Sequence, residues 1–189
     1  NKTAYDFVKD ELNIETPTIF EITKERLIRA SKKIQEENKG KDLSKQDLGF
    51  KIFETMPIWE DYNFEADELD AQQMLLFNES KLTKEDIKAL LVTWKTYDGV
   101  SLSQSLQDID LTDYTANYSN GKLYLMDKGF KTKNLKTLLE KIDSDKDFNP
   151  TTIIAFGYHF ESKNLREISE NIKSYANKKS IDIDFITRY

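Results

Sequence analysis

The C-terminal third of the chain, residues 120–189, alternates between short apolar runs and longer amphipathic stretches. The apolar runs cover residues 122–126 (KLYLM), 151–156 (TTIIAF) and 181–187 (IDIDFIT). Each run has the length of a β-strand and is bounded by turn-forming or polar residues. Strands that alternate with helical stretches predict crossover connections, and therefore a parallel arrangement.

The two stretches between these strands have the apolar spacing of helices. Their apolar faces comprise Leu135, Leu138, Leu139 and Ile142, and then Leu165, Ile168, Ile172 and Tyr175. We expect Thr132 and Ser162 to cap the two helices and Gly157 to allow a sharp turn after the second strand. The alternation of Ile and Asp in residues 181–185 predicts an edge strand or one with a wet face. Residues 120–189 thus predict a mixed α/β (α+β) fold with a small, mostly parallel sheet.

Helices and a short hairpin are predicted before this sheet. A strand at 114–118 should pair with 122–126 across Ser119-Asn120-Gly121, because Asn and Gly accept positive φ. Another short strand is expected at 106–111. Thr83 should cap a helix whose core stripe ends before Asp98-Gly99 and comprises Ile87, Leu90, Leu91 and Trp94. Residues 48–56 alternate as a strand would, and residues 1–15 form an ordered lead-in.

A helix is predicted from about Thr18 to Glu37, with a capping box between Thr18 and Glu21. Its apolar face includes Ile19, Ile22, Leu27, Ala30 and Ile34. Its basic flank consists of Arg26, Arg29 and Lys33, which are three and four residues apart. This flank is either a solvated face or a contact for phosphate or an acidic partner surface.

The sequence lacks the usual constellations of catalysis and cofactor binding. No two of the six glycines form G-x-G, there is no Cys, and His159 is the only His. We therefore assign no catalytic, cofactor-binding or metal-binding residues. Residues 58–79 are acidic but lack the glycine and spacing of a calcium loop, so a solvated loop or short helix is expected there.

Bulk properties restrict the class of protein. The net charge of −6 argues against a free-standing, non-specific DNA-binding protein, which would usually be basic. No apolar run approaches the roughly 20 residues of a membrane span. The lack of Cys permits an intracellular location. Because the chain begins with Asn, we expect it to be a piece of a longer protein.

Several segments together resemble the methylation (Mod) subunits of type III restriction–modification systems. The helix from Thr18 to Ile34 is similar to the helix that follows the methyltransferase core in that family, and Leu48-Gly-Phe-Lys-Ile-Phe53 resembles the strand that comes next. The later matches follow in the family's order, at residues 97–99 (YDG), 114–116 (YTA), 123–125 (LYL), 149–160 (NPTTIIAFGYHF) and 188–189 (RY). The resemblance extends over the chain from Thr16 onward.

The resemblance implies a C-terminal domain without catalytic function. The family transfers methyl groups from S-adenosylmethionine to N6 of adenine in DNA, using D-P-P-Y and F-x-G-x-G motifs that lie upstream of the matching helix. Neither motif occurs here, so this chain alone is expected to be inactive. We expect residues 1–45 to be the lead-in and basic helix after the methyltransferase core, and residues 46–189 the C-terminal domain. The implied partners are a second Mod subunit, the restriction (Res) subunit and, through the full-length protein, DNA, all in the cytoplasm.

Two other hypotheses remain at this point. The chain is a stand-alone intracellular protein-interaction domain, or it is a small enzyme that uses Tyr158, His159 and Glu161 at a strand end. If the chain is the C-terminal domain of a Mod subunit, some apolar residues of 1–37 should face the missing part. An exposed apolar patch is then expected around Ile19, Phe20 and Leu27.

Overall fold

A computed structural model describes residues 2–56 and 82–189, so the acidic segment at 58–79 lies outside the described residues. The chain divides into two compact units, Asn1–Glu54 and Thr55–Tyr189. The predicted boundary between residues 45 and 46 stays a prediction.

The first unit is built around one long helix. Helix α1 (Lys2–Asp6) continues into the π-helical turn η1 (Phe7–Glu11), and α2 covers Ile19–Glu37. The guanidinium of Arg29 on α2 lies 5.3 Å from the centre of the Phe7 ring, which joins η1 to α2. Thr18 has the extended backbone of an N-cap, but its side chain makes no capping hydrogen bond. The predicted capping box is therefore absent.

The predicted strand at 48–56 is wrong, since these residues form no strand. A strand forms only where a second strand pairs with its backbone, and alternation of side chains does not supply that second strand. Phe50, Ile52 and Phe53 are all exposed.

The second unit contains a five-stranded mixed sheet, in the order β1-β2-β3-β4-β5. Strands β1 (Gln107–Asp110), β2 (Thr115–Ser119) and β3 (Lys122–Leu125) form an antiparallel meander. Strands β4 (Thr152–Phe156) and β5 (Asp184–Arg188) extend it in parallel with β3. The predicted mixed α/β fold is confirmed. The arrangement at 120–189 is parallel, whereas the whole sheet is half antiparallel because the meander joins it.

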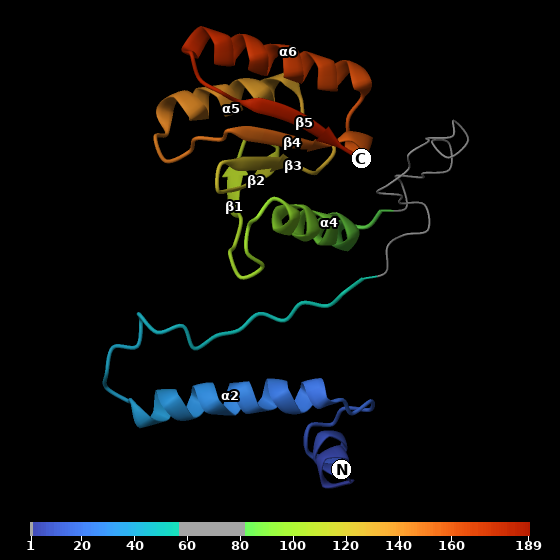
Figure 1. The fold of residues 1–189 in the computed structure, drawn as a ribbon, viewed down its shortest axis with the longest axis vertical. Helices are drawn as coiled ribbons and strands as arrows, with labels where there is room; N and C mark the ends of the chain where they lie inside the picture. The colour runs from blue at the N-terminus through green and yellow to red at the C-terminus, as the bar shows by residue number, and fades with distance from the viewer. Residues whose placement is uncertain (1, 57–81) are drawn as a thin grey trace, which may run out of the picture. The chain divides into compact units, whose positions relative to one another are not determined.

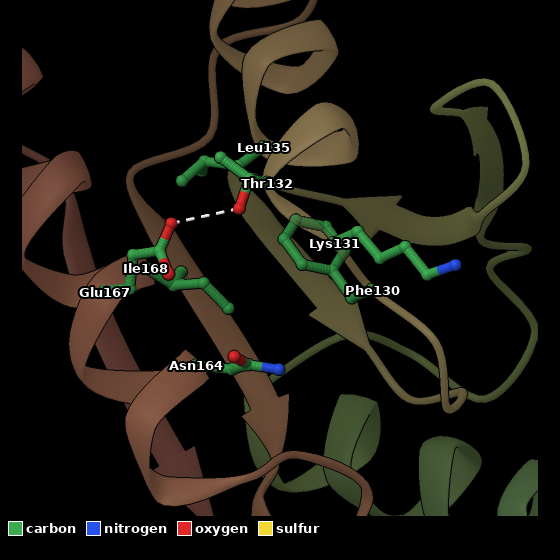
Figure 2. Close-up of a pocket in the computed structure, with 7 residues that line it drawn as sticks. All are labelled: Phe130, Lys131, Thr132, Leu135, Asn164, Glu167 and Ile168. Atoms are coloured by element: carbon green, nitrogen blue, oxygen red, sulfur yellow. Dashed lines mark hydrogen bonds between the residues drawn. The ribbon is translucent and has the colours of Figure 1, made fainter.

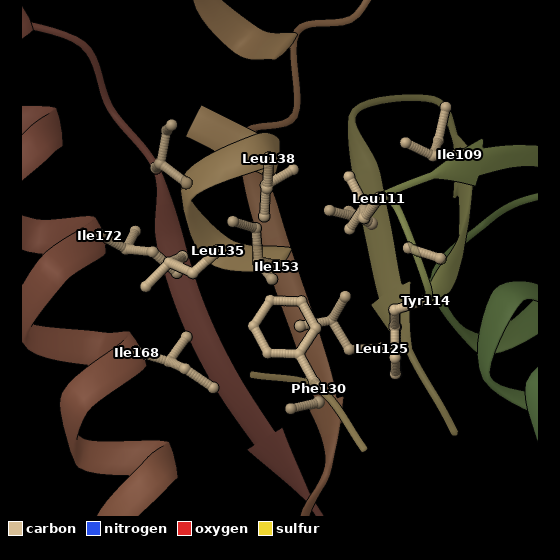
Figure 3. Close-up of a cluster of buried hydrophobic side chains, with 14 of the residues drawn as sticks. Ile109, Leu111, Tyr114, Leu125, Phe130, Leu135, Leu138, Ile153, Ile168 and Ile172 are labelled. Atoms are coloured by element: carbon tan, nitrogen blue, oxygen red, sulfur yellow. The ribbon is translucent and has the colours of Figure 1, made fainter. Parts of the chain in front are cut away.

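Helices cover both faces of this sheet (Figure 1). Helices α5 (Thr132–Ser144) and α6 (Ser162–Lys179) are the two crossovers and lie on one face, whereas α4 (Lys84–Tyr97) lies on the other. The larger core, between the sheet and the crossover helices, includes Leu138, Ile153 and Ile172 (Figure 3). The smaller core joins α4 to the opposite face through Trp94, Ile154 and Phe156. Strand β4 is buried at every position, as its continuous apolar run predicted.

The turn between β2 and β3 confirms its prediction. Asn120 and Gly121 have φ values of 48° and 76°, the left-handed conformation that a tight hairpin turn requires. The start of α4 also follows its local sequence. Thr83 accepts a hydrogen bond from the Asp86 N–H at 3.2 Å, and the Asp86 carboxylate accepts one from the Thr83 N–H at 2.8 Å.

Neither crossover helix has the predicted cap. The Thr132 hydroxyl donates to Glu167 on α6 at 3.0 Å. The buried Asn134 accepts from the Lys131 N–H at 2.7 Å in its place. Helix α6 begins after Glu161, and neither that residue nor Ser162 makes a side-chain cap. At α5, the hydrogen bond from Thr132 to α6 thus takes the side chain that was expected to cap the helix.

Candidate functional site

The basic flank of α2 is largely paired within its own helix. Arg29 donates to Glu25 at 2.7 Å, and the Lys33 ammonium lies 3.7 Å from the Glu37 carboxylate. Arg26 is exposed and has no ion-pair partner among the described residues. Of the three, Arg26 is thus the one that forms no ion pair within the described ranges. The role of Arg26, Arg29 and Lys33 in phosphate or partner contact stays a prediction.

The apolar side of α2 is uncovered within the first unit. No residue of this helix is buried. Ile19 is 83% exposed, and the large side chains of Phe20, Leu27 and Ile34 are exposed as well. The exposure predicted for Ile19, Phe20 and Leu27 is confirmed. Phe20, Leu27 and Ile34 recur at intervals of seven residues, so they lie along one stripe of the helix.

His159 lies at the carboxyl ends of the parallel strands and contacts residues of the fold there. His159 lies in the 3₁₀ turn η3 (Gly157–His159), directly after β4. Its Nδ1 lies 2.6 Å from the Met126 carbonyl oxygen, at the end of the neighbouring β3. Its ring packs edge-on against Phe156, with 4.7 Å between centroids. The hypothesis of an enzyme built on Tyr158, His159 and Glu161 stays untested.

Sequence reasoning missed a polar cluster at the same end of the sheet. Arg188, the last residue of β5, donates two hydrogen bonds to the Asp98 carboxylate beyond the end of α4, at 2.6 and 2.9 Å. The Tyr124 hydroxyl donates to the same carboxylate at 2.9 Å. The Arg188 guanidinium also lies 5.6 Å from the ring centre of Trp94 and 5.7 Å from that of Tyr97.

Electrostatics stabilise the charged forms of this pair. Burial alone would raise the pKa of Asp98, but the hydrogen bonds from Arg188 and Tyr124 outweigh it and lower that pKa below its ordinary value. Burial, and then the hydrogen bond to Asp98, raises the pKa of the Tyr124 hydroxyl. Asp98 and Arg188 both lie within segments that carried the family resemblance, at 97–99 and 188–189. No sequence signal joined the two segments, because their contact depends on the position of β5.

Hollows are open on the described part of the second unit, and two of them concern the elements above. One, of about 260 Å³, lies beside this cluster and is lined by Thr93, Trp94, Tyr97, Arg188 and Tyr189. The other, of about 140 Å³, lies between the start of α5 and the side of α6 (Figure 2). Its wall includes the Thr132–Glu167 hydrogen bond and the side chain of Asn164.

Neither metal-binding clusters nor membrane-crossing helices are found in the described ranges. Among residues 2–56 and 82–189, no three His, Asp or Glu side chains are grouped as metal ligands would be. Within the same ranges, no helix combines the length and hydrophobicity that crossing a membrane requires.

A protein-family model matches part of the second unit. Residues 85–181, from the first turn of α4 to just beyond α6, match the model of the type III R-M EcoP15I C-terminal domain. That range is more than half of the 189 residues. The chain belongs to this family. The Asp98 end of the ion pair lies inside the matched region, and β5 lies just beyond it.

Curated relatives are similar over nearly the whole chain. The chain is 40% identical over 200 residues to the type III restriction-modification enzyme EcoP15I Mod subunit of Escherichia coli, an alignment that covers 100% of the chain and 29% of that protein. It is also 40% identical over 183 residues to the EcoPI Mod subunit of Escherichia phage P1, covering 95% of the chain and 27% of that protein. The StyLTI Mod subunit of Salmonella typhimurium is 27% identical over 198 residues, covering 91% and 29% respectively. This family member thus spans less than a third of the length of these relatives.

Proposed function

We propose that the chain is the non-catalytic C-terminal part of a type III Mod subunit and that it serves assembly. The observation that carries this proposal is the uncovered apolar side of α2. Most helices in proteins are stabilised by the packing of an apolar face. Helix α2 has 19 residues and none of them is buried, so it lacks this stabilisation. Its exposed stripe of Phe20, Leu27 and Ile34 is the kind of surface that another protein part covers.

The charges of α2 favour a protein partner over nucleic acid. The helix carries five cations, Lys24, Arg26, Arg29, Lys32 and Lys33, and four anions, Glu21, Glu25, Glu36 and Glu37, for a net charge of +1. Ion pairs within the helix hold several of these charges. A surface that neutralises several phosphates would need more free cations.

The chemistry of the longer protein belongs, in this proposal, to a part outside these 189 residues. That part would bind S-adenosylmethionine and methylate N6 of adenine in DNA, since the present chain has neither D-P-P-Y nor G-x-G. The residues present therefore do not fit this cofactor, and no step of methyl transfer is assigned to them. We propose a second Mod subunit, a restriction (Res) subunit and DNA as partners, and the cytoplasm as the location.

The coding DNA upstream of Asn1 tests the proposal directly. We expect an open frame that encodes D-P-P-Y and F-x-G-x-G before the present chain. A start codon immediately before Asn1 would contradict the proposal and favour a stand-alone interaction domain.

The assembly role has its own test on α2. The double change Phe20→Glu and Leu27→Glu places charges on the apolar stripe, and we expect it to reduce co-purification of the complete Mod protein with its Res subunit at least tenfold. Lys32→Glu, on the opposite side of α2, is the matched control. If the unmodified protein, the double variant and Lys32→Glu co-purify equally with Res, the role of the stripe is contradicted. Thermal unfolding of each variant reports whether the fold is retained.

A contact with the phosphate backbone of DNA is tested separately at Arg26. If Arg26 touches phosphate, Arg26→Ala should weaken DNA binding by the complete protein and reduce its salt dependence. Unchanged affinity and salt dependence would remove this contact from the proposal.

A further inference from the structure

A hollow of about 260 Å³ opens beside the ion pair of Asp98 and Arg188. Trp94 is almost fully buried and lies at its deep side, whereas Tyr97 and Tyr189 are 85% and 57% exposed at its rim. Exposed aromatic rings offer their faces and edges to a further ring. Pockets for whole small-molecule ligands are usually about 300–1,000 Å³. A hollow of this size and lining therefore suits one aromatic side chain.

The groups around the hollow are already held in place. Two hydrogen bonds to Asp98 fix the Arg188 guanidinium, which lies 5.7 Å from the ring centre of Tyr97. Tyr189 packs edge-on against Tyr158, with 5.2 Å between the ring centroids. A surface that is ordered before binding loses little conformational entropy when a partner arrives. Trp, Tyr and Arg are also the residues that contribute most to binding at protein interfaces.

The charge of Arg188 is balanced within the fold. It pairs with the Asp98 carboxylate at 2.6 Å, so it is not free to attract a phosphate or a carboxylate group. Binding of nucleic acid depends on cations that neutralise phosphates. An uncharged aromatic side chain requires no such attraction. The hollow therefore favours a protein segment over nucleic acid.

The hollow continues the open edge of strand β5. Arg188 is the last residue of β5 and lines the hollow, and β5 lies at the end of the strand order. Among the described residues no strand pairs with the outer side of β5. The strand contains neither Pro nor Lys, with which many proteins protect an edge. An extended segment is thus able to add to β5 as a further strand.

The register of β5 determines how such a segment pairs. The Asp184 N–H donates to the Thr151 carbonyl at 2.9 Å, so the backbone groups of Asp184 face β4. Because these groups alternate along a strand, those of Phe185 and Thr187 face outward. In an antiparallel addition, the residue opposite Thr187 exchanges hydrogen bonds with it. The residue opposite Arg188 makes no hydrogen bond to β5, and its side chain lies on the same sheet face as that of Arg188.

Two side chains of an added segment meet features of β5 on that face. Arg188 and Ile186 share the face that α4 covers, because Arg188 reaches Asp98 there. A residue opposite Arg188 lies beside the hollow. The residue two positions further along the segment lies opposite Ile186, whose side chain is 39% exposed. A fitting segment therefore has an aromatic residue, then any residue, then an aliphatic residue.

We propose that the hollow and the edge of β5 together bind an extended segment of another protein. The segment runs antiparallel to β5 and places an aromatic side chain in the hollow. A second copy of β5 does not fit, because Asp184, Ile186 and Arg188 place no ring on the face of the hollow. The inference rests on the proposed assembly role and names the chemistry of one partner. It uses none of the residues of α2.

A pair of short peptides tests the aromatic side chain. The first is acetyl-Thr-Phe-Thr-Val-Thr-amide, whose Phe is placed to lie opposite Arg188 and whose Val is placed to lie opposite Ile186. The second has Ala instead of Phe. Isothermal titration calorimetry with the full chain should show about tenfold tighter binding of the Phe peptide, because a ring seated among aromatic side chains contributes strongly. Equal affinities, or no binding of either peptide, would overturn the proposal.

A variant of the rim tests whether the hollow is the site. Tyr97→Ala removes one exposed ring and should bring the affinities for the two peptides together. The matched control is Leu102→Ala, which is exposed on the loop after α4, does not line the hollow and should keep the preference for Phe. If Tyr97→Ala keeps that preference, the proposal is overturned. Should thermal unfolding show that Tyr97→Ala does not fold, Thr93→Arg, which fills the hollow from its exposed side, replaces it with the same two outcomes.

Two methylated forms of the Phe peptide test the strand pairing without a change in the protein. Methylation of the backbone nitrogen of the Thr after Phe removes an N–H that faces Thr187, and should weaken binding about tenfold. Methylation of the backbone nitrogen of the Phe removes an N–H that points away from β5, and should leave the affinity unchanged. Equal affinities of the two forms, or the reverse order, would overturn the antiparallel addition.

The same peptides separate this inference from the role of α2. The Phe20→Glu and Leu27→Glu variant should bind the Phe peptide as the unmodified chain does. The complete Mod protein should bind it too, since a loss there would show that another part of Mod occupies the surface and would overturn the choice of a different protein. Failure of the peptides to bind leaves the co-purification test of α2 intact. A start codon directly before Asn1 would overturn the proposed function, while the peptides would still report on β5.

Discussion

Asp98 and Arg188 lie 90 residues apart in the chain and form a two-pronged ion pair between the end of α4 and the end of β5. The Asp98 side chain is only 6% exposed, and that of Arg188 is 24% exposed. The pair therefore links the edge strand β5 to the end of α4, which lies on the sheet face opposite the crossover helices. The planar guanidinium of Arg188 forms two hydrogen bonds with one carboxylate and lies over the rings of Trp94 and Tyr97. A Lys side chain does not offer this geometry.

The Asp98 carboxylate should make stability depend on pH. Asp98→Asn removes the charge that pairs with Arg188, and at pH 7 we expect it to lower the free energy of unfolding by about 1.5–3 kcal/mol. Because the folded-state pKa of Asp98 is lowered below 3.8, its contribution is complete above that pH and is lost as the pH falls through the lowered value.

Urea unfolding of the unmodified chain and of Asp98→Asn between pH 3 and pH 7 measures this effect. The difference in free energy between the two proteins should be constant above about pH 5 and shrink below pH 3.8. A difference that stays constant down to pH 3 would contradict the stabilisation of the charged form of Asp98.

A side chain at position 157 would collide with the ring of Tyr189. A Cβ atom at position 157 would lie closer to Cε1 of Tyr189 than any ordinary contact. Gly157→Ala should displace that ring from its edge-on contact with Tyr158, at a cost of about 1 kcal/mol. In a Tyr189→Ala background the same glycine change should cost much less. Urea unfolding of the four proteins measures this coupling, and equal costs in the two backgrounds would contradict it.

Lys95 organises the loop that follows α4. Its side chain is almost fully buried, and its ammonium donates to the carbonyls of Ser101, Leu102 and Gln104, the first two at 3.0 and 3.3 Å. Lys95→Met keeps the apolar stem but leaves these carbonyls without the ammonium. We expect a loss of about 1–3 kcal/mol in unfolding free energy and faster amide exchange at 101–106. Lys88→Met, at an exposed site on α4, should change neither quantity. Similar behaviour of the two variants would count against this role.

Asn134 connects the start of α5 to the turn between β1 and β2. Its buried amide donates to the Leu111 carbonyl at 2.8 Å and to the Asp113 carboxylate at 2.7 Å, and its oxygen accepts from the Lys131 N–H. Asn134→Ala leaves the carbonyl of the buried Leu111 and the N–H of Lys131 without this partner, and we expect it to cost about 2–3 kcal/mol. Chemical denaturation of this variant is compared with that of the exposed Asn177→Ala. A cost below about 0.5 kcal/mol, typical of surface changes, would contradict the role of Asn134.

Predictions from sequence held where neighbouring residues supply the interaction. The Asn120-Gly121 turn and the Thr83–Asp86 cap each depend on residues that are adjacent or one helical turn apart. The apolar run of β4 likewise predicted a strand covered on both faces. The strand predicted at 48–56 failed because a strand also needs a partner, which an alternating pattern does not show.

The caps of the crossover helices illustrate the other limit. Thr132 has the chemistry of an N-cap, but its hydroxyl bonds to Glu167, and Asn134 holds the helix end because Leu111 and Asp113 are nearby in space. From the sequence alone, Gly157 is expected to allow a sharp turn. A turn does begin there, but the close approach of Tyr189, far along the chain, is what excludes a side chain.

The sequence by itself determined the strands and helices of residues 83–189, the alternation that produces two crossovers, and the family to which the chain is similar. These follow from hydrophobic periodicity and turn chemistry, which act over a few residues. Only the tertiary structure decided that Asp98 meets Arg188, that Tyr189 lies on Gly157, and that β5 presents an open edge with opposite charges at its two ends. Such contacts join residues far apart in the chain, and their partners are set by the order of the strands in the sheet, which no local pattern encodes.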